Sequence, residues 1–271
     1  MRASSEREIR PKGKKALWLL CGSLVLILTA SATAATIVQK GNLRLSVDGK
    51  LSPTKLPRKG TAPISVTVGG EISTTDESLP PTLKELRIEL NREGVLDYAG
   101  LPLCRYAKIQ PASTQRALSG CRPSLIGKGS FSVAITLAGQ EPYLTQGRLV
   151  VFNGQRGGKP VLFGHIYSPK PFATSFVIVF SVSKKRSGTY ATVLSAKLPK
   201  AMKAWGRLTG LEMTLSRRYS SGGKSRSYIS AGCPAPKGFS KVSFPLARTS
   251  FEFSGGKRLS SVLSSTCSAR G

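Results

Sequence analysis

The residues of this chain best suited to bind a ligand are a group of basic and aromatic side chains in its last quarter. Arginine and lysine form ion pairs with anions, and arginine and tyrosine also stack on flat rings. A Ser-Ser-Gly-Gly stretch, 220–223, lies in the middle of the group and predicts the tip of a hairpin that brings its two halves together. We therefore expect an anionic, ring-containing ligand to bind at Arg217, Arg218, Tyr219, Lys224, Arg226 and Tyr228.

These basic residues also have a simpler explanation. Lys and Arg commonly occupy solvent-facing positions and keep exposed strand edges from pairing with other chains. A second basic turn, Lys184-Lys185-Arg186, allows the same two interpretations. Trp205 is either a platform on which a sugar stacks or, as we expect, a core residue at the start of a strand. Only the positions of these side chains in the fold separate the alternatives.

The sequence offers little for catalysis. Its single histidine, His165, lies in an apolar stretch, and no G-x-S-x-G motif or comparable nucleophile motif accompanies it. Glu85, Glu89 and Glu93 are spaced by four, which on a strand places them on one face, and we expect that face to be solvated. A glycosidase needs two converging carboxylates, and nothing marks such a pair. We therefore expect His165 to be a buried or sheet-edge residue with a structural hydrogen bond, and we expect no catalytic residues, no metal and no cofactor.

Five cysteines are present, and one of them, Cys21, lies in the apolar segment near the N-terminus. Two leucines precede it where a lipid-attachment signal requires a small residue, so we do not expect lipidation. The other four are an even number, which in an oxidising compartment indicates two disulfides. We favour Cys104 with Cys121 and Cys233 with Cys267, because each pair closes a short loop, worth roughly 3 to 4 kcal/mol in the chain-entropy account. Their spacings match no zinc motif.

Residues 1–34 have the features of an export signal or a membrane anchor. Six basic residues lie within the first 15, and an uncharged run of 20 residues follows from Ala16 to Ala35. Ala32-Thr33-Ala34 predicts signal-peptidase cleavage immediately after it, and the strongly apolar part ends near Leu28, which favours cleavage. An uncleaved anchor is the alternative, because about 20 residues span a membrane as a helix. In both cases we expect residues 35–271 to lie outside the cytoplasm.

From Gly41 onward the pattern is typical of β-strands. Apolar residues alternate with polar ones at 43–47 and 64–68, and denser apolar runs at 149–152 and 176–182 suit central strands. Turn residues separate these runs. Asn153-Gly154 is a hairpin signal, although the Gly157-Gly158 that follows suggests a longer loop, and Gly222-Gly223 and Gly255-Gly256 mark two further hairpins.

Two segments are less regular. Thr82 and Glu85 form a capping-box signature for a helix, but Leu86, Ile88 and Leu90 alternate, so we favour a strand. Residues 113–119 predict a short helix, which Ser113 caps and Gly120 ends. We therefore predict an all-β fold, an antiparallel β-sandwich or jelly-roll-like domain over residues 35–271 with one short helix near 113–119.

Positive charge is concentrated in the later part of the chain. The formal net charge is +28; residues 35–97 hold nine basic and eight acidic residues, whereas residues 98–271 hold 26 basic and three acidic ones. Such a field attracts polyanions and falls off beyond a Debye length of roughly 8 Å. We expect an anionic cell-wall polymer or a membrane surface as the partner, and we do not expect specific nucleic-acid binding.

Six stretches of the chain carry a family resemblance. They are Gly100-Leu101-Pro102-Leu103-Cys104, Trp205-Gly206, Ser216-Arg217-Arg218-Tyr219, Ser227-Tyr228, the segment from Ser230 to Phe239, and Phe244-Pro245-Leu246-Ala247-Arg248. The chain resembles a group of exported proteins without an assigned activity, encoded mostly in high-GC Gram-positive bacteria. The resemblance covers nearly all of the exported part. It implies export and an all-β fold, and it carries over no functional residues.

The export segment and the charge together predict a function. We expect a non-enzymatic extracytoplasmic protein, associated with the cell envelope, that binds anionic polymer or membrane surface through a basic face. The alternative is a hydrolase of carbohydrate or ester substrates with a site around His165 or tyrosine residues. A deep polar pocket holding a carboxylate would favour the hydrolase, and basic side chains around an aromatic-lined groove would favour binding.

Overall fold

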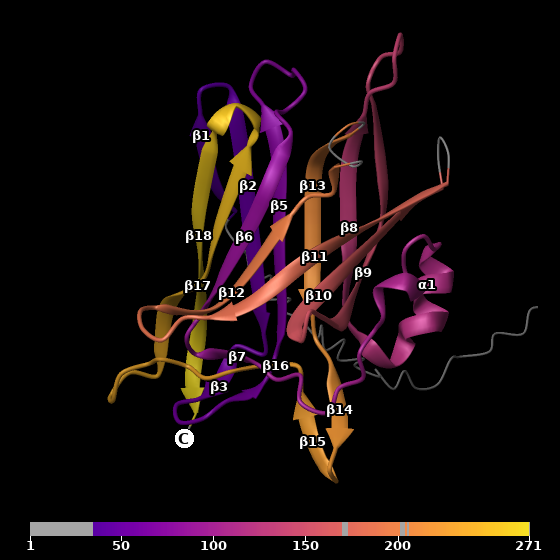
Figure 1. Ribbon diagram of the computed structural model, residues 1–271. Helices are drawn as coiled ribbons and strands as arrows, with labels where there is room; N and C mark the ends of the chain where they lie inside the picture. Colours follow the sequence, from indigo (N-terminus) through magenta and orange to yellow (C-terminus); the bar gives the residue numbers. More distant parts are fainter. Residues whose placement is uncertain (1–34, 170–172, 201–203, 205, 271) are drawn as a thin grey trace, which may run out of the picture. The chain divides into compact units, whose positions relative to one another are not determined.

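The computed structural model describes residues 35–169, 173–200, 204 and 206–270, all within one unit, Thr33–Gly271 (Figure 1). The expected signal or anchor segment, with Cys21, and the tryptophan at 205 lie outside the described residues. Among the described residues, no helix is both long enough and apolar enough to cross a membrane.

Thirteen of the described strands form a single sheet. All neighbouring pairs in it are antiparallel except the last, which is parallel. The all-β prediction is therefore confirmed. In spatial order the strands are β1 (Thr36–Lys40), β2 (Leu43–Ser52), β5 (Ser65–Thr74), β13 (Gly206–Leu215), β8 (Leu125–Ile135), β9 (Tyr143–Arg156), β10 (Lys159–Ser168), β11 (Thr174–Lys184), β12 (Tyr190–Lys197), β6 (Leu83–Asn91), β17 (Lys241–Phe253), β18 (Arg258–Arg270) and β3 (Lys55–Pro57).

Two small sheets and a few short helical segments complete the described fold. One small sheet has the order β4 (Ala62–Pro63), β16 (Ile229–Ala231) and β7 (Gly94–Leu96), and the other is the hairpin of β14 (Arg218–Ser221) and β15 (Lys224–Ser227). The helical segments are η1 (Tyr106–Lys108), α1 (Thr114–Cys121), η2 (Arg122–Ser124) and η3 (Ser254–Gly256).

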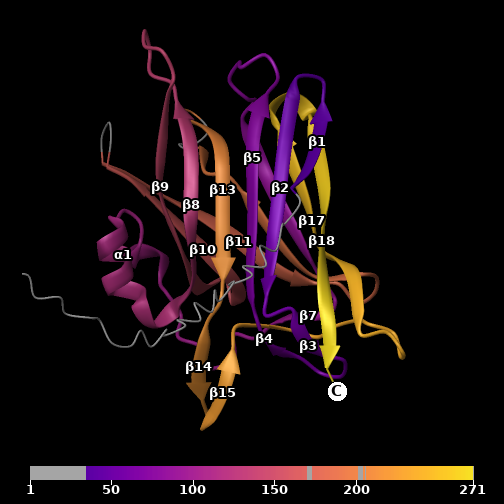
Figure 2. The same ribbon diagram turned by 180° about the vertical axis from the view of Figure 1, so that it is seen from behind.

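The main sheet curls so that its two halves face each other, as two sheets do in a sandwich. Strands β1, β2, β5, β13, β8 and β9 form one layer, and strands β10, β11, β12, β6, β17 and β18 form the other (Figures 1 and 2). Alternation places Leu43, Leu45 and Val47 of β2 between the layers, all fully buried. Ile88 of β6 and Phe251 of β17 enter the same core from the opposite layer.

The first and last long strands of the sheet come together where it closes. The Thr36 hydroxyl donates a hydrogen bond to the carbonyl oxygen of Val262, at 3.5 Å. A Cβ at Gly49 of β2 would lie 2.9 Å from the Leu263 side chain, so glycine permits β18 to pack closely on β2. The C-terminal strand therefore covers the N-terminal edge of the sheet.

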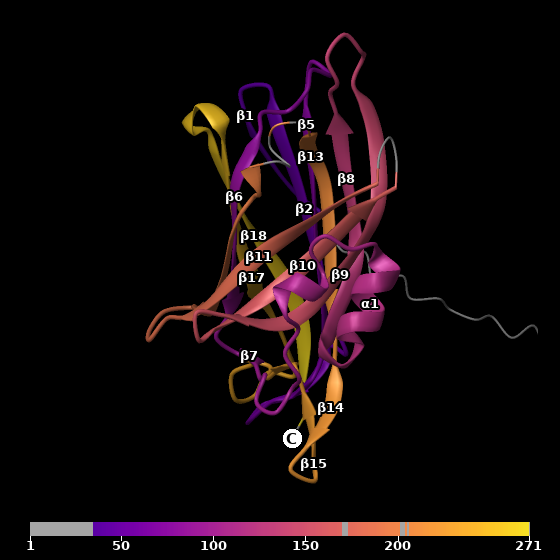
Figure 3. The same cartoon turned by 45° about the vertical axis from the view of Figure 1, so that its right-hand side comes forward.

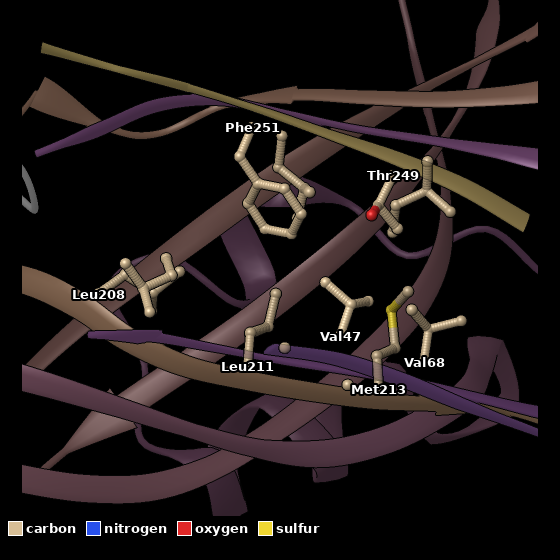
Figure 4. A pocket seen from close by; sticks show the side chains of 12 residues that line it. Val47, Val68, Leu208, Leu211, Met213, Thr249 and Phe251 are labelled. Carbon is tan, nitrogen blue, oxygen red and sulfur yellow. The ribbon is translucent and has the colours of Figure 1, made fainter. Parts of the chain in front are cut away.

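A small apolar cavity lies between the two layers. Its volume is about 30 Å³, and Val47, Val68, Met213 and Phe251 are among the side chains that surround it (Figure 4). Thr249 brings its hydroxyl to the same space. A cavity of this size and lining is a packing defect, because a buried water needs several polar partners.

Helix α1 lies outside the sheet. Ser113 caps α1 by accepting a hydrogen bond from the Arg116 backbone NH at 3.3 Å, and the helix continues through the predicted stop at Gly120 to Cys121. The Cys104–Cys121 disulfide ties this segment down, with a Cα–Cα distance of 5.3 Å. A second small core, which includes Phe152 and Phe163, fills the space between the helix and the outer face of β9 and β10 (Figure 3).

The hairpin signalled near Asn153-Gly154 forms, but its turn lies at Gly157-Gly158, the pair that had suggested a longer loop. Strand β9 continues to Arg156, and the turn to β10 is formed by Gly157 and Gly158, both with positive φ. Asn153 is buried, and its amide donates to the carbonyl oxygen of Pro102 at 3.2 Å. Asn153 and Gly154 do not form the turn. They lie within β9, where the Asn153 amide binds the segment that packs on the sheet.

Candidate functional site

Four chain segments meet at one end of the main sheet: residues 53–64, 92–101, 216–241 and 267–270. The β4–β16–β7 ladder joins the first three, and β3 pairs with the end of β18. The Cys233–Cys267 disulfide, with a Cα–Cα distance of 5.8 Å, links the third segment to β18, and both predicted disulfides are thereby confirmed. We call these four segments the basic end; they lie together at the bottom of Figures 1 and 2.

Arg58 holds one loop of the basic end in place. Its guanidinium donates hydrogen bonds to the carbonyl oxygens of Ala235 and Pro236, both at 2.5 Å, and of Phe239 at 2.9 Å. Hydrogen bonds from a charged donor are stronger than neutral ones. The loop therefore presents Lys237 and Phe239 outward from a fixed backbone, and Phe239 is 63% exposed.

The predicted β14–β15 hairpin forms, with Gly222 and Gly223 at its tip, both with positive φ. The Tyr219 hydroxyl lies 3.1 Å from the carbonyl oxygen of Asp97, and the Arg226 guanidinium pairs with the Asp97 carboxylate at 2.8 Å. Burial, aided by the Asp97 charge, raises the pKa of Tyr219. Tyr219 and Arg226 therefore attach the hairpin to the loop that follows β7.

The six residues predicted to bind a ligand do not all face solvent. Tyr228 is 1% exposed and belongs to the main core, where burial raises the pKa of its hydroxyl, so including it as a surface contact was wrong. Arg217 is half-buried, whereas Arg218 and Lys224 are exposed. The hairpin therefore offers cations to a partner, but the stacking surface expected from Tyr228 is absent from the described surface.

Positive charge dominates the basic end well beyond the hairpin. Its segments contain eleven basic residues and two acidic ones, Glu93 and Asp97, of which Asp97 pairs with Arg226. Most of the basic side chains are exposed. The eleven are Lys55, Arg58, Lys59, Arg92, Arg217, Arg218, Lys224, Arg226, Lys237, Lys241 and Arg270.

The face of β6 that carries the spaced glutamates is not solvated throughout, which corrects the prediction. Glu89 is 3% exposed. Arg87, two residues before it, approaches one carboxylate oxygen at 3.2 Å, and Lys185 and Arg248 also form ion pairs with the carboxylate. Lys185, from the predicted second basic turn, is therefore committed to a structural contact.

The environment of Glu89 keeps it ionised. Burial raises its pKa, but the hydrogen bonds from Lys185, Arg248 and Arg87 outweigh this effect and lower the pKa to about 2. Arg248 also lies over the ring of Tyr190, 4.9 Å from its centroid. A single buried carboxylate thus organises three cations, which come from β6, from β17 and from the residue that follows β11.

Of the two positions predicted for His165, buried or at a sheet edge, the structure shows the buried one. Its Nε2 lies 3.0 Å from the carbonyl oxygen of Ala112, which accepts only, so Nε2 carries the proton. Burial lowers the pKa of the imidazole, and the bond to Ala112 acts in the opposite direction. The neutral imidazole fastens the segment before α1 to β10.

A groove that the sequence analysis missed crosses the outer face of β10, β11 and β12. It has a volume of about 820 Å³ and contains both apolar and charged side chains. Its floor includes Val161, Phe163 and Val179. The alternation of side chains along β10 and β11 places these three on the same face of the sheet as Lys159. Its wall at Tyr106 comes from η1, a segment distant in sequence, which no local pattern indicates.

The chain was compared with protein-family models, curated proteins and solved structures, and none of the three comparisons found a match.

Proposed function

We propose that this protein is a non-enzymatic, extracytoplasmic component of the cell envelope that binds anionic polymer or membrane surface through its basic end. The observation that carries the proposal is the charge of this region, eleven basic residues against two acidic ones. Cations spaced over a surface of this size bind a polyanion by releasing its counterions, without a single deep site.

The scaffold of the basic end supports this function. Arg58 fixes the loop of residues 234–240 through three carbonyl oxygens, and the Cys233–Cys267 disulfide joins that segment to β18. Cations on a fixed backbone lose less conformational entropy when they bind a partner. Exposed Phe239 lies between Lys237 and Lys241, where it adds an apolar contact to the ionic ones.

The proposed location rests on the disulfides and the N-terminal sequence. Two disulfides are typical of proteins from oxidising compartments. The proposal retains export by residues 1–34, either cleaved or kept as an anchor, and the resemblance to exported proteins of high-GC Gram-positive bacteria. Specific nucleic-acid binding is not part of it. The hydrolase alternative gains no support from His165, because the imidazole is closed off in the interior.

The test is sedimentation of the purified protein with bacterial cell walls over a series of salt concentrations. We expect binding at low salt that is lost by about 0.5 M salt. A variant that neutralises four exposed cations of the basic end should bind at least about fivefold more weakly. Its substitutions are Arg218→Gln, Lys224→Gln, Lys237→Gln and Lys241→Gln.

A control variant that loses the same number of positive charges distinguishes binding through the basic end from attraction by the net charge of the whole protein. Its four positions are exposed and lie at the opposite end of the strands, at the end of β1, the starts of β2 and β6, and the β17–β18 turn. They are Lys40→Gln, Arg44→Gln, Lys84→Gln and Lys257→Gln. Equal weakening by both variants, no binding at low salt, or binding that 0.5 M salt leaves unchanged would contradict the proposal.

A further inference from the structure

The groove on the outer face of β10, β11 and β12 has the dimensions of a ligand site. Its volume of about 820 Å³ lies within the range of clefts that hold small molecules, roughly 300 to 1,000 Å³. It shares no residue with the basic end. Any ligand bound in it is therefore additional to the polymer or membrane surface proposed above.

The floor of the groove is apolar. Phe163, Val179 and Val161 project from adjacent strands onto the same face of the sheet, where Phe163 is paired in register with Val179. Gly154 of β9 has no side chain beneath the Phe163 ring; a Cβ there would lie 2.2 Å from a ring carbon. The missing side chain lets the phenyl ring lie down across β9, where it is buried and supports the floor from beneath.

Tyr106 forms one wall of the groove. Its ring meets Phe163 edge-on, with centroids 5.9 Å apart, and it is 45% exposed. The Cys104–Cys121 disulfide, two residues before it, attaches this segment to α1. An aromatic ring in a fixed position beside an apolar floor is suited to contact a flat or extended apolar group.

The rim of the groove is basic. Arg156 and Lys159 flank the turn between β9 and β10, and Lys197 lies on the far side, on β12. All three are exposed. The one carboxylate of the groove, Glu85, is paired in register with Lys197, so the formal charge of the lining is +2. By register Lys197 lies across from Phe163, two strands away, whereas Lys159 lies four residues further along β10, so the two backbone positions are roughly 16 Å apart on opposite sides of the floor.

We infer that this groove binds a small amphipathic organic anion, whose apolar ring or chain lies against the exposed ring of Tyr106 and the half-buried Val179, and whose phosphate, sulfonate or carboxylate group is held by one of the rim cations. Apolar contact supplies most of the affinity, since charged groups at this exposure add little each. The charge sets the preference for an anion over a neutral molecule of the same shape.

The experiment titrates the folded protein with anilinonaphthalenesulfonate, a fluorescent anion with aromatic rings. We expect saturable binding to one site. The double variant Lys159→Gln with Lys197→Gln should weaken the dissociation constant about fivefold. N-phenylnaphthylamine, which lacks the sulfonate, should bind the variant and the parent protein equally. Tyr106→Ala should weaken both probes, because it removes the wall that they share.

The control is Lys40→Gln with Arg44→Gln, which removes the same charge from exposed positions outside the groove. It should leave the dissociation constant within about twofold of the parent value, because isolated surface charges contribute little. Four results would overturn the inference: no saturable binding, binding that the Lys159 and Lys197 changes leave intact, equal weakening by the two double variants, or displacement of the probe by inorganic sulfate at equal concentration. The first two would leave the cell-wall proposal unaffected, since that proposal uses other residues.

Discussion

Replacing Glu89 by glutamine tests whether its cation cluster stabilises the sheet. The pKa of Glu89 falls from its ordinary value of 4.5 to about 2 in the folded protein. At about 1.36 kcal/mol per pKa unit this amounts to about 3 kcal/mol at neutral pH. Solvent screens part of it, because the side chains of Arg87, Lys185 and Arg248 are 42%, 37% and 43% exposed. We therefore expect Glu89→Gln to lower the free energy of unfolding by about 2 kcal/mol at neutral pH.

The pH dependence makes this prediction specific. Because the folded pKa lies below the unfolded one, the stabilisation is present above about pH 4.5 and is lost as the pH falls toward 2. Urea denaturation at about pH 7 and about pH 2.5 should show the gap between parent and variant shrinking to less than about half. Glu212→Gln, at an exposed glutamate of β13, should change stability by no more than about 0.5 kcal/mol at either pH. A gap of equal size at both pH values would refute the argument.

Three further predictions concern packing and the basic end. Gly70→Ala should raise the free energy of unfolding by about 1 to 2 kcal/mol in thermal denaturation, because its Cβ would lie 3.7 Å from Phe251 at the edge of the internal cavity; a lower melting temperature would contradict this. Gly154→Ala should instead lower the free energy of unfolding by about 2 kcal/mol or more in the same assay, since its Cβ would lie 2.2 Å from the Phe163 ring. An unchanged melting temperature would contradict the close packing of Phe163 on Gly154. Arg58→Ala should speed proteolysis within residues 234–240, because three carbonyl oxygens there lose their hydrogen-bond donor. Lys59→Ala is the control, and equal cleavage of the two variants would exclude the role given to Arg58.

Local patterns in the sequence predicted those parts of the fold that depend on neighbouring residues. The alternation of Leu86, Ile88 and Leu90 identified β6 against a competing helix signal, because inward and outward positions repeat every two residues in a strand. Gly222-Gly223 identified a hairpin, because both residues take positive φ at its tip. The two disulfides were predicted because four cysteines remain after Cys21 and the favoured pairs close the shortest loops.

The errors arise where a residue's environment comes from distant parts of the chain. Glu89 was expected in solvent, but Arg248 reaches it from a strand 159 residues later. Tyr228 follows a basic, polar hairpin, yet the residues after it enter the β4–β16–β7 sheet and carry its ring into the core. The groove was missed for the same reason, because its wall at Tyr106 and its cation at Lys197 are brought together only by the fold.

The position of β18 has a consequence for how the protein assembles. This strand is the last 13 residues of the described chain, yet it pairs with β17 and β3 and covers the edge formed by the earliest strands. Without this strand, the core is exposed along the edge of β17, and Cys233 has no partner for its disulfide. Closure of the sheet therefore depends on β18, and a chain that lacks residues 258–270 would expose apolar side chains of the core and would be prone to aggregation.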